Sequence, residues 1–79
     1  MELARQIELD ARVLELLADA QGHECIKHQL ELSEAAVRGS FLRLRARFSA
    51  RDEVGIVIMA TRSGVVRISD RLIRKWRGD

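Results

Sequence analysis

The sequence predicts an all-α fold, a small helix-turn-helix bundle of four to five helices forming one domain over residues 1–79. Three observations predict it. A chain of 79 residues has room for one modest core. Apolar residues recur at helical spacing along much of the chain. Ser33 and the acidic residue after it have the pattern that starts a helix. The alternative is a winged helix, in which residues 54–69 form a β-hairpin.

The first helix is expected over residues 2–20. Its apolar stripe consists of Leu9, Val13, Leu16, Leu17 and Ala20, widened by Leu3, Ile7 and Leu14. Gly22 is a plausible stop, because glycine readily adopts the left-handed conformation that ends helices. A short second helix follows over residues 23–30, with Ile26 and Leu30 facing inward. Glu31 and Leu32 then make a tight connection to the next helix.

The third helix, residues 34–48, has the clearest pattern. Ser33 is its predicted N-cap, and Glu34 suits the positive end of the helix dipole. The side predicted to face the core carries Val37, Phe41, Leu44 and Phe48. The opposite strip carries Ala35, Gly39, Leu42 and Ala46. Arginines border this strip on both flanks, Arg38 and Arg45 on one side and Arg43 and Arg47 on the other.

Small residues between cations fit a helix that lies in the major groove of DNA. Such a helix needs little bulk where its backbone approaches the bases, and cations where the phosphates pass. Gly39 costs about 1 kcal/mol relative to alanine in a helix interior, and close approach to a partner is one reason for that cost. The alternative interpretation is an exposed helix whose small residues pack against a second protein.

Residues 54–69 are rich in Val, Ile and Thr, and their composition is compatible with two structures. One is a β-hairpin that turns at residues 62–64. The other is a fourth helix over residues 52–61 that is ended by Gly64.

In the tail, Ser69 or Asp70 caps a short helix. One side of that helix carries Leu72, Ile73 and Trp76, and its charge comes from Arg71, Arg74, Lys75 and Arg77.

The formal net charge of +2 is unevenly distributed. Residues 1–34 hold eight acids against three bases, a net of −5, and residues 35–79 hold four acids against eleven bases, a net of +7. A basic half beside an acidic half indicates one face that meets a polyanion. No stretch is long and apolar enough for a membrane span, and the N-terminus lacks the pattern of a signal peptide. We therefore expect a cytoplasmic protein with no membrane partner.

The sequence shows no pattern typical of a metal site, a catalytic site or a phosphate-binding loop. His23, Cys25 and His28 cluster at the second helix, but the chain has no further Cys or His, so we expect no metal site and a half-buried thiol at Cys25. No nucleophile, base and acid form a catalytic pattern, and no glycine-rich phosphate loop occurs. Glu8 and Asp10 are assigned to a charged helix face. We expect no catalytic residue, no cofactor and no enzyme activity.

From Val13 to about Val65 the chain resembles the LuxR/FixJ-type DNA-binding domain. VLELLADA matches the family's first-helix run, LSEAAVRGSF its serine cap, acidic residue, core valine and basic residue, and RFSARDEVGIVIMATRSGV the end of its recognition helix and a fourth helix closed by glycine. The resemblance implies a transcription regulator that binds inverted repeats as a dimer. SEAAVRGSFLRLRARF is also similar to the last helix of a sigma-factor promoter-binding region.

The resemblance places Ser33, Ala35, Ala36, Arg38, Gly39 and Arg43 on the DNA-facing side, and Val57 and Ala60 on the helix that often supports dimerisation. The sequence departs from the family at several of these positions: Ala35 and Ala36 replace a basic residue and a threonine, and Gly39 and Ser40 replace a polar pair. Glu31 stands where the family has a turn glycine, and Lys27 where it has a small residue. The family's base preference therefore does not transfer.

The first hypothesis is a sequence-specific regulator that binds double-stranded DNA as a homodimer on an inverted repeat. Its predicted contact residues are Ser33, Ala35, Ala36, Arg38, Gly39, Leu42, Arg43, Arg45 and Arg47. The second hypothesis is a protein-binding module on the same scaffold, which captures another regulator or RNA polymerase. Salt dependence separates the two, because phosphate neutralisation makes affinity fall steeply with salt.

Overall fold

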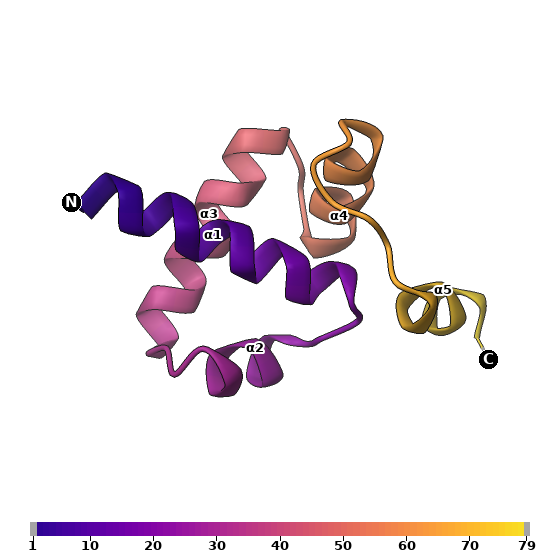
Figure 1. The fold of residues 1–79 in the computed structure, drawn as a ribbon, viewed down its shortest axis with the longest axis horizontal. Helices are drawn as coiled ribbons and strands as arrows, with labels where there is room; N and C mark the ends of the chain where they lie inside the picture. Colours follow the sequence, from indigo (N-terminus) through magenta and orange to yellow (C-terminus); the bar gives the residue numbers. More distant parts are fainter. Residues whose placement is uncertain (1, 79) are drawn as a thin grey trace.

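A computed structural model describes residues 2–78, which form five α-helices and no strand (Figure 1). The helices are α1 (Glu2–Ala18), α2 (His23–Gln29), α3 (Glu34–Phe48), α4 (Glu53–Arg62) and α5 (Asp70–Arg77). The all-α prediction is confirmed. The winged-helix alternative is wrong, because most of the segment expected as a hairpin is helical. None of the helices in residues 2–78 has the length and apolarity needed to cross a membrane.

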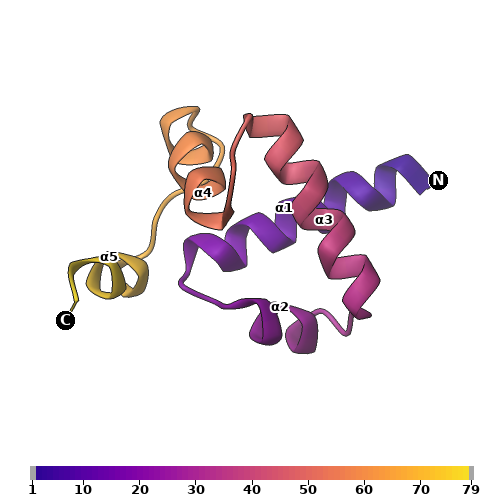
Figure 2. The same cartoon turned by 180° about the vertical axis from the view of Figure 1, so that it is seen from behind.

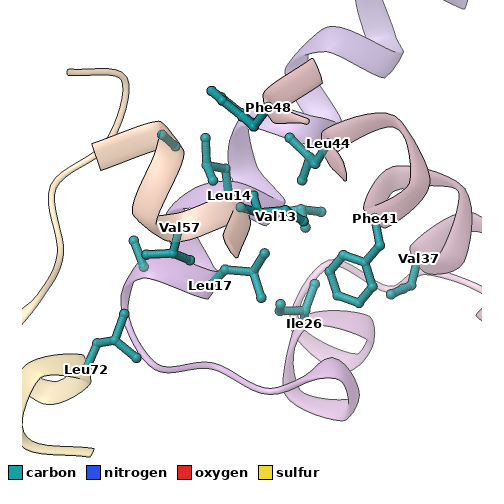
Figure 3. Close-up of a cluster of buried hydrophobic side chains, with 13 residues drawn as sticks. Val13, Leu14, Leu17, Ile26, Val37, Phe41, Leu44, Phe48, Val57 and Leu72 are labelled. Carbon is teal, nitrogen blue, oxygen red and sulfur yellow. The ribbon is translucent and has the colours of Figure 1, made fainter. Parts of the chain in front are cut away.

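The core lies between α1, α3 and α4, with α2 closing one end (Figure 3). The inner side of α3 is the predicted one, since Val37, Phe41, Leu44 and Phe48 are all buried. The facing residues are Val13, Leu14 and Leu17 of α1, Ile26 of α2, and Ile56, Val57 and Ala60 of α4. Because α3 buries one full side in this core, its opposite side is left facing outward.

The N-terminal turns of α1 differ from the prediction. Leu3 and Ile7 continue the apolar stripe, yet 69% and 59% of their surfaces are exposed. The reason is length: α1 runs past α3, and its first turns project beyond the other helices (Figures 1 and 2). An apolar stripe predicts burial only where a second element reaches it.

Three helix ends close with left-handed residues that are not glycine, at Ala20, Glu31 and Ser49. Ala20 has φ 66°, and the N–H of Gln21 donates to the Leu16 carbonyl at 3.0 Å. This is a Schellman motif, which ends α1 at Ala18 rather than at the predicted Ala20. Gly22 is instead the N-cap residue of α2.

The α2–α3 connection repeats the same motif. Glu31 has φ 51°, and the N–H of Leu32 donates to the Lys27 carbonyl at 2.9 Å. The left-handed position is thus the one where the resemblance expects glycine. Ser33 then caps α3 as predicted, because its Oγ accepts from the N–H of Ala36 at 3.1 Å.

The last helix sits at the edge of the bundle (Figure 1). Ser69 caps α5, with its Oγ accepting from the N–H of Leu72 at 3.2 Å, and its own N–H donates to the Ala18 carbonyl at 3.0 Å. Leu72 is buried, whereas Ile73 and Trp76 are about two-fifths exposed. Of the three apolar residues predicted on one side of this helix, Leu72 alone enters the core.

Candidate nucleic-acid interface

The outer strip of α3 consists of small residues and one exposed leucine. Ala35 and Ala46 are exposed, Gly39 is half-buried, and 54% of the Leu42 surface is exposed. Ser33, at the helix start, is also exposed, and Ala36 is half-buried. Ala35, Gly39, Leu42 and Ala46 therefore lie on the side of α3 opposite its buried side chains, as predicted from their spacing.

Three of the four flanking arginines make only weak contacts within the chain. Arg38 is the most open, with a side chain 71% exposed and its Nη2 3.8 Å from Oε2 of Glu34. Arg47 is exposed and lies over the Phe48 ring, 4.9 Å from its centroid. Half-buried Arg45 donates weakly to the Arg51 carbonyl at 3.4 Å. Such exposed pairs contribute little to stability, so these side chains are available to a partner.

Arg43 is held by α1. Its Nε donates to Oδ2 of Asp10 at 2.8 Å, and its Nη2 donates to Oδ1 at 2.9 Å. The Oγ of buried Ser40 donates to the same Oδ1 at 2.6 Å. These bonds raise the pKa of Arg43 above its usual value, chiefly through the hydrogen bonds to Asp10, so the guanidinium stays charged.

Asp10 corrects the sequence assignment. It was assigned to a charged helix face, yet it is buried and bonded to Ser40 and Arg43 of α3. A signal was present, because Asp10 stands three, four and seven residues before Val13, Leu14 and Leu17, within the buried stripe of α1. An acid in an apolar stripe needs a partner, and Ser40 and Arg43 satisfy both of its oxygens.

A second polar cluster joins α2 to the first turn of α3. Glu34 accepts hydrogen bonds from Lys27 at 3.3 Å and pairs with His23 Nε2 at 2.8 Å. These two bonds, Lys27 first, lower the pKa of Glu34 below its ordinary value. The His23 ring also packs edge-on against Phe41, with centroids 5.3 Å apart. The cluster fixes the first turn of α3 against α2.

The histidines and the cysteine do not converge. Cys25 is exposed, which contradicts the expected half-buried thiol, and His23 is directed to Glu34. Ligand atoms of His23, Glu24 and Glu34 lie within 4.8 Å of one another. Lys27, however, lies 3.9 Å from Glu24 and 3.3 Å from Glu34. Both carboxylates of this group therefore already pair with the ammonium group of Lys27.

The outward side of α4 is apolar. Val57 and Ala60, which the resemblance places on the dimerisation helix, are buried in the core of one chain. The exposed apolar residues of α4 and the turn after it are Val54, Ile58, Met59 and Val65. Val57 and Ala60 are therefore not accessible to a second chain, whereas these four residues are.

No family model, curated protein or solved structure matches this chain. Its function must therefore be argued from the geometry of α3 and the residues around it.

Proposed function

We propose that this protein is a transcriptional regulator that binds double-stranded DNA in a sequence-specific manner through α2 and α3, as the resemblance to LuxR/FixJ-type domains suggests. The supporting observation is the outward side of α3, where small residues form a strip between arginines. Of the four, Arg38 and Arg47 are the most exposed. The basic charge of residues 35–79 supports the same partner.

The strip fits a DNA groove in size and chemistry. The 15 residues of α3 span about 22 Å, and the major groove of B-DNA admits one α-helix. Arg38, Arg45 and Arg47 are proposed to contact phosphates. Leu42 would meet the methyl group of a thymine, and the backbone at Gly39 would approach the bases most closely.

The proposed unit is a homodimer on an inverted repeat. An apolar patch on α4 and the following turn (Val54, Ile58, Met59 and Val65) is exposed in the single chain. Val54 and Ile58 stand four residues apart, on the same side of α4, and exposed apolar residues grouped in this way are typical of association surfaces. A two-fold pair through this patch would place the two α3 helices on two related half-sites.

The test is selection of random duplex DNA by the purified protein at near-physiological salt. We expect a motif with two related half-sites, and an affinity that falls linearly with salt on a log–log plot. Arg38→Ala and Arg47→Ala should each weaken binding of every sequence and flatten that slope. Arg62→Ala, an exposed arginine on α4, is the matched control. Recovery of unenriched sequence, or no retained DNA, would reject the proposal.

One observation favours a second function, a module that binds another regulator or RNA polymerase. Leu42 is exposed on the same side of α3 as the small residues. An exposed leucine flanked by alanines suits a packed protein interface as well as a thymine methyl. Binding to such a partner would persist at salt concentrations that remove DNA, and Leu42→Ala would weaken it more than Arg38→Ala.

A further inference from the structure

The contact between Arg43 and Asp10 leaves part of the guanidinium unused. Asp10 accepts from Nε and from Nη2, which form one edge of the planar group. A guanidinium carries five N–H donors, two of them on Nη1 and a second one on Nη2. Among the described residues no hydrogen bond engages Nη1. The end edge, with one N–H from each terminal nitrogen, therefore remains as a two-pronged donor.

Gly39 fixes where that end edge lies. A Cβ placed on Gly39 would stand 3.4 Å from Nη1 of Arg43. The guanidinium thus reaches back one helical turn, and its Nη1 lies beside the side-chain position of Gly39 in the outer strip. Arg43 comes from the flank of α3, but Asp10 holds its donors beside the strip proposed to face the bases.

We propose that Arg43 reads a guanine through this end edge, and that Asp10 is the positioning residue that aims it. The inference rests on the proposed DNA binding and goes beyond it by assigning one base contact. Two parallel N–H donors match the O6 and N7 acceptors that guanine presents in the major groove. A phosphate accepts the same fork. The place of Nη1 beside Gly39, on the outer strip between the flank of Arg38 and the opposite flank of Arg47, favours the base.

Preorganisation gives Asp10 a distinct signature. An arginine side chain loses rotamer entropy when it is fixed, and here Asp10 fixes it before DNA binds. Asp10 also places a negative charge near the phosphates, which lowers affinity for all DNA. Asp10→Asn should therefore weaken binding to the selected site while it preserves or strengthens binding to unrelated duplex. A residue that only stabilised the fold would weaken both.

The experiment compares wild type, Asp10→Asn, Arg43→Lys and Ser40→Ala on the selected duplex, on each single-base replacement of it, and on unrelated duplex. For wild type we expect one guanine whose replacement costs about 5- to 150-fold in affinity. Asp10→Asn and Arg43→Lys should lose most of that discrimination and keep it at other positions. Ser40→Ala, which leaves both hydrogen bonds between Asp10 and Arg43 in place, should retain it.

The possible results distinguish failure of the inference about Arg43 from failure of the proposed function. Undiminished guanine discrimination in folded Asp10→Asn and Arg43→Lys overturns the inference and leaves the proposed function standing. An equal loss on all duplexes makes Arg43 a phosphate contact and also overturns it. If Asp10→Asn fails to fold by circular dichroism, Arg43→Lys decides, because lysine keeps the charge beside Asp10 but cannot present a planar fork. A wild type that selects no sequence rejects the inference together with the proposed function.

Discussion

Single side chains on α3 divide by direction into three sets. The buried set holds the helix to the core, the outer strip keeps the backbone accessible, and the arginines stand at the flanks. Arg43 differs from the other three flanking arginines because it forms an ion pair with Asp10 of α1. Charge alone would rank the four arginines as equals, and the structure makes one of them a fixed donor.

Gly39→Ala should stabilise the fold and weaken DNA binding. Alanine gains about 0.5–1 kcal/mol in a helix interior, and its Cβ would meet Nη1 of Arg43 at 3.4 Å, an ordinary contact distance. The added methyl group would stand on the strip proposed to approach the bases. Chemical denaturation and DNA titration measure the two effects. Ala46→Gly is the control, with stability expected to change in the opposite direction; a destabilised Gly39→Ala would contradict the prediction.

The turns between helices follow a shared physical rule. α1, α2 and α3 all end in a Schellman motif, and the left-handed residues are Ala20, Glu31 and Ser49. An L-residue adopts this conformation at a cost that glycine avoids. A glycine at any of these three positions would therefore relieve a conformational cost without changing the hydrogen bonds of the motif.

Glu31→Gly should raise the free energy of unfolding by up to about 1 kcal/mol, because glycine adopts the left-handed conformation without the steric cost that glutamate has there. The greater conformational entropy of glycine in the unfolded chain offsets part of this gain. Urea denaturation measures the change. Gln29→Gly, in the last turn of α2, is the matched control and should lower stability. Equal destabilisation by both substitutions would show that the φ of 51° at Glu31 carries no strain.

The contact between α2 and α3 should weaken in acid. The pKa of Glu34 is lower in the folded chain than its ordinary 4.5. Its stabilising contribution is therefore fully present above about pH 4.5 and is lost as pH falls through the lowered folded value. Unfolding free energies of wild type and Glu34→Gln, measured across this range, should converge toward low pH. A difference that stays constant with pH would be evidence against the ionised contact.

The whole molecule consists of a tight core and a peripheral helix. α1, α3 and α4 share the core, and α5 is tethered by Leu72, by the bond from Ser69 to the Ala18 carbonyl, and by an ion pair between Arg71 and Asp19 at 3.7 Å. Few buried contacts imply a low local stability. We expect α5 to open before the rest of the fold.

Leu72→Ala should detach α5 at a cost of about 2 kcal/mol, the low end for a buried leucine, because the site lies at the edge of the core. Emission from Trp76, the chain's single tryptophan, should shift to the red, and amides of α5 should lose exchange protection while those of α3 keep it. Ile73→Ala, at a residue 40% exposed, should change neither observable much. Simultaneous loss of all protection would mean that α5 belongs to the cooperative core.

Ile58→Glu should abolish self-association and leave the monomer's stability nearly unchanged. Ile58 is 40% exposed in the middle of the apolar patch on α4, so a charge there is tolerated in the single chain and buried in the proposed dimer. Sedimentation velocity over a range of concentrations gives the oligomeric state. Ile73→Glu, with the same exposure on α5, controls for added charge; if it dissociates the dimer instead, the interface lies elsewhere.

Much of the fold was predictable because its signals are local. The bounds of α3, its cap at Ser33 and its four inward residues depend on spacing and on one hydroxyl. The choice between helix and hairpin for residues 54–69 was not, because Val, Ile and Thr suit both states in a short run. The structure has the helix, capped by Asp52 Oδ1 accepting from the Gly55 N–H at 2.8 Å, with Ile56, Val57 and Ala60 buried.

Periodicity and capping thus predicted α1, α2, α3 and α5 and the side of α3 that turns outward, since these depend on neighbours within a few residues. Residues 54–69 were the exception. The crossing of α1 over α3 determined which side chains of α3 are free and which are bound to another helix. It buried Asp10, left Ile7 exposed, and bound Arg43 across a separation of 33 residues. A contact of that kind depends on where two helices meet in space. Residue spacing within one helix does not contain that information. The position of the Arg43 guanidinium beside Gly39 therefore depends on how α1 packs against α3.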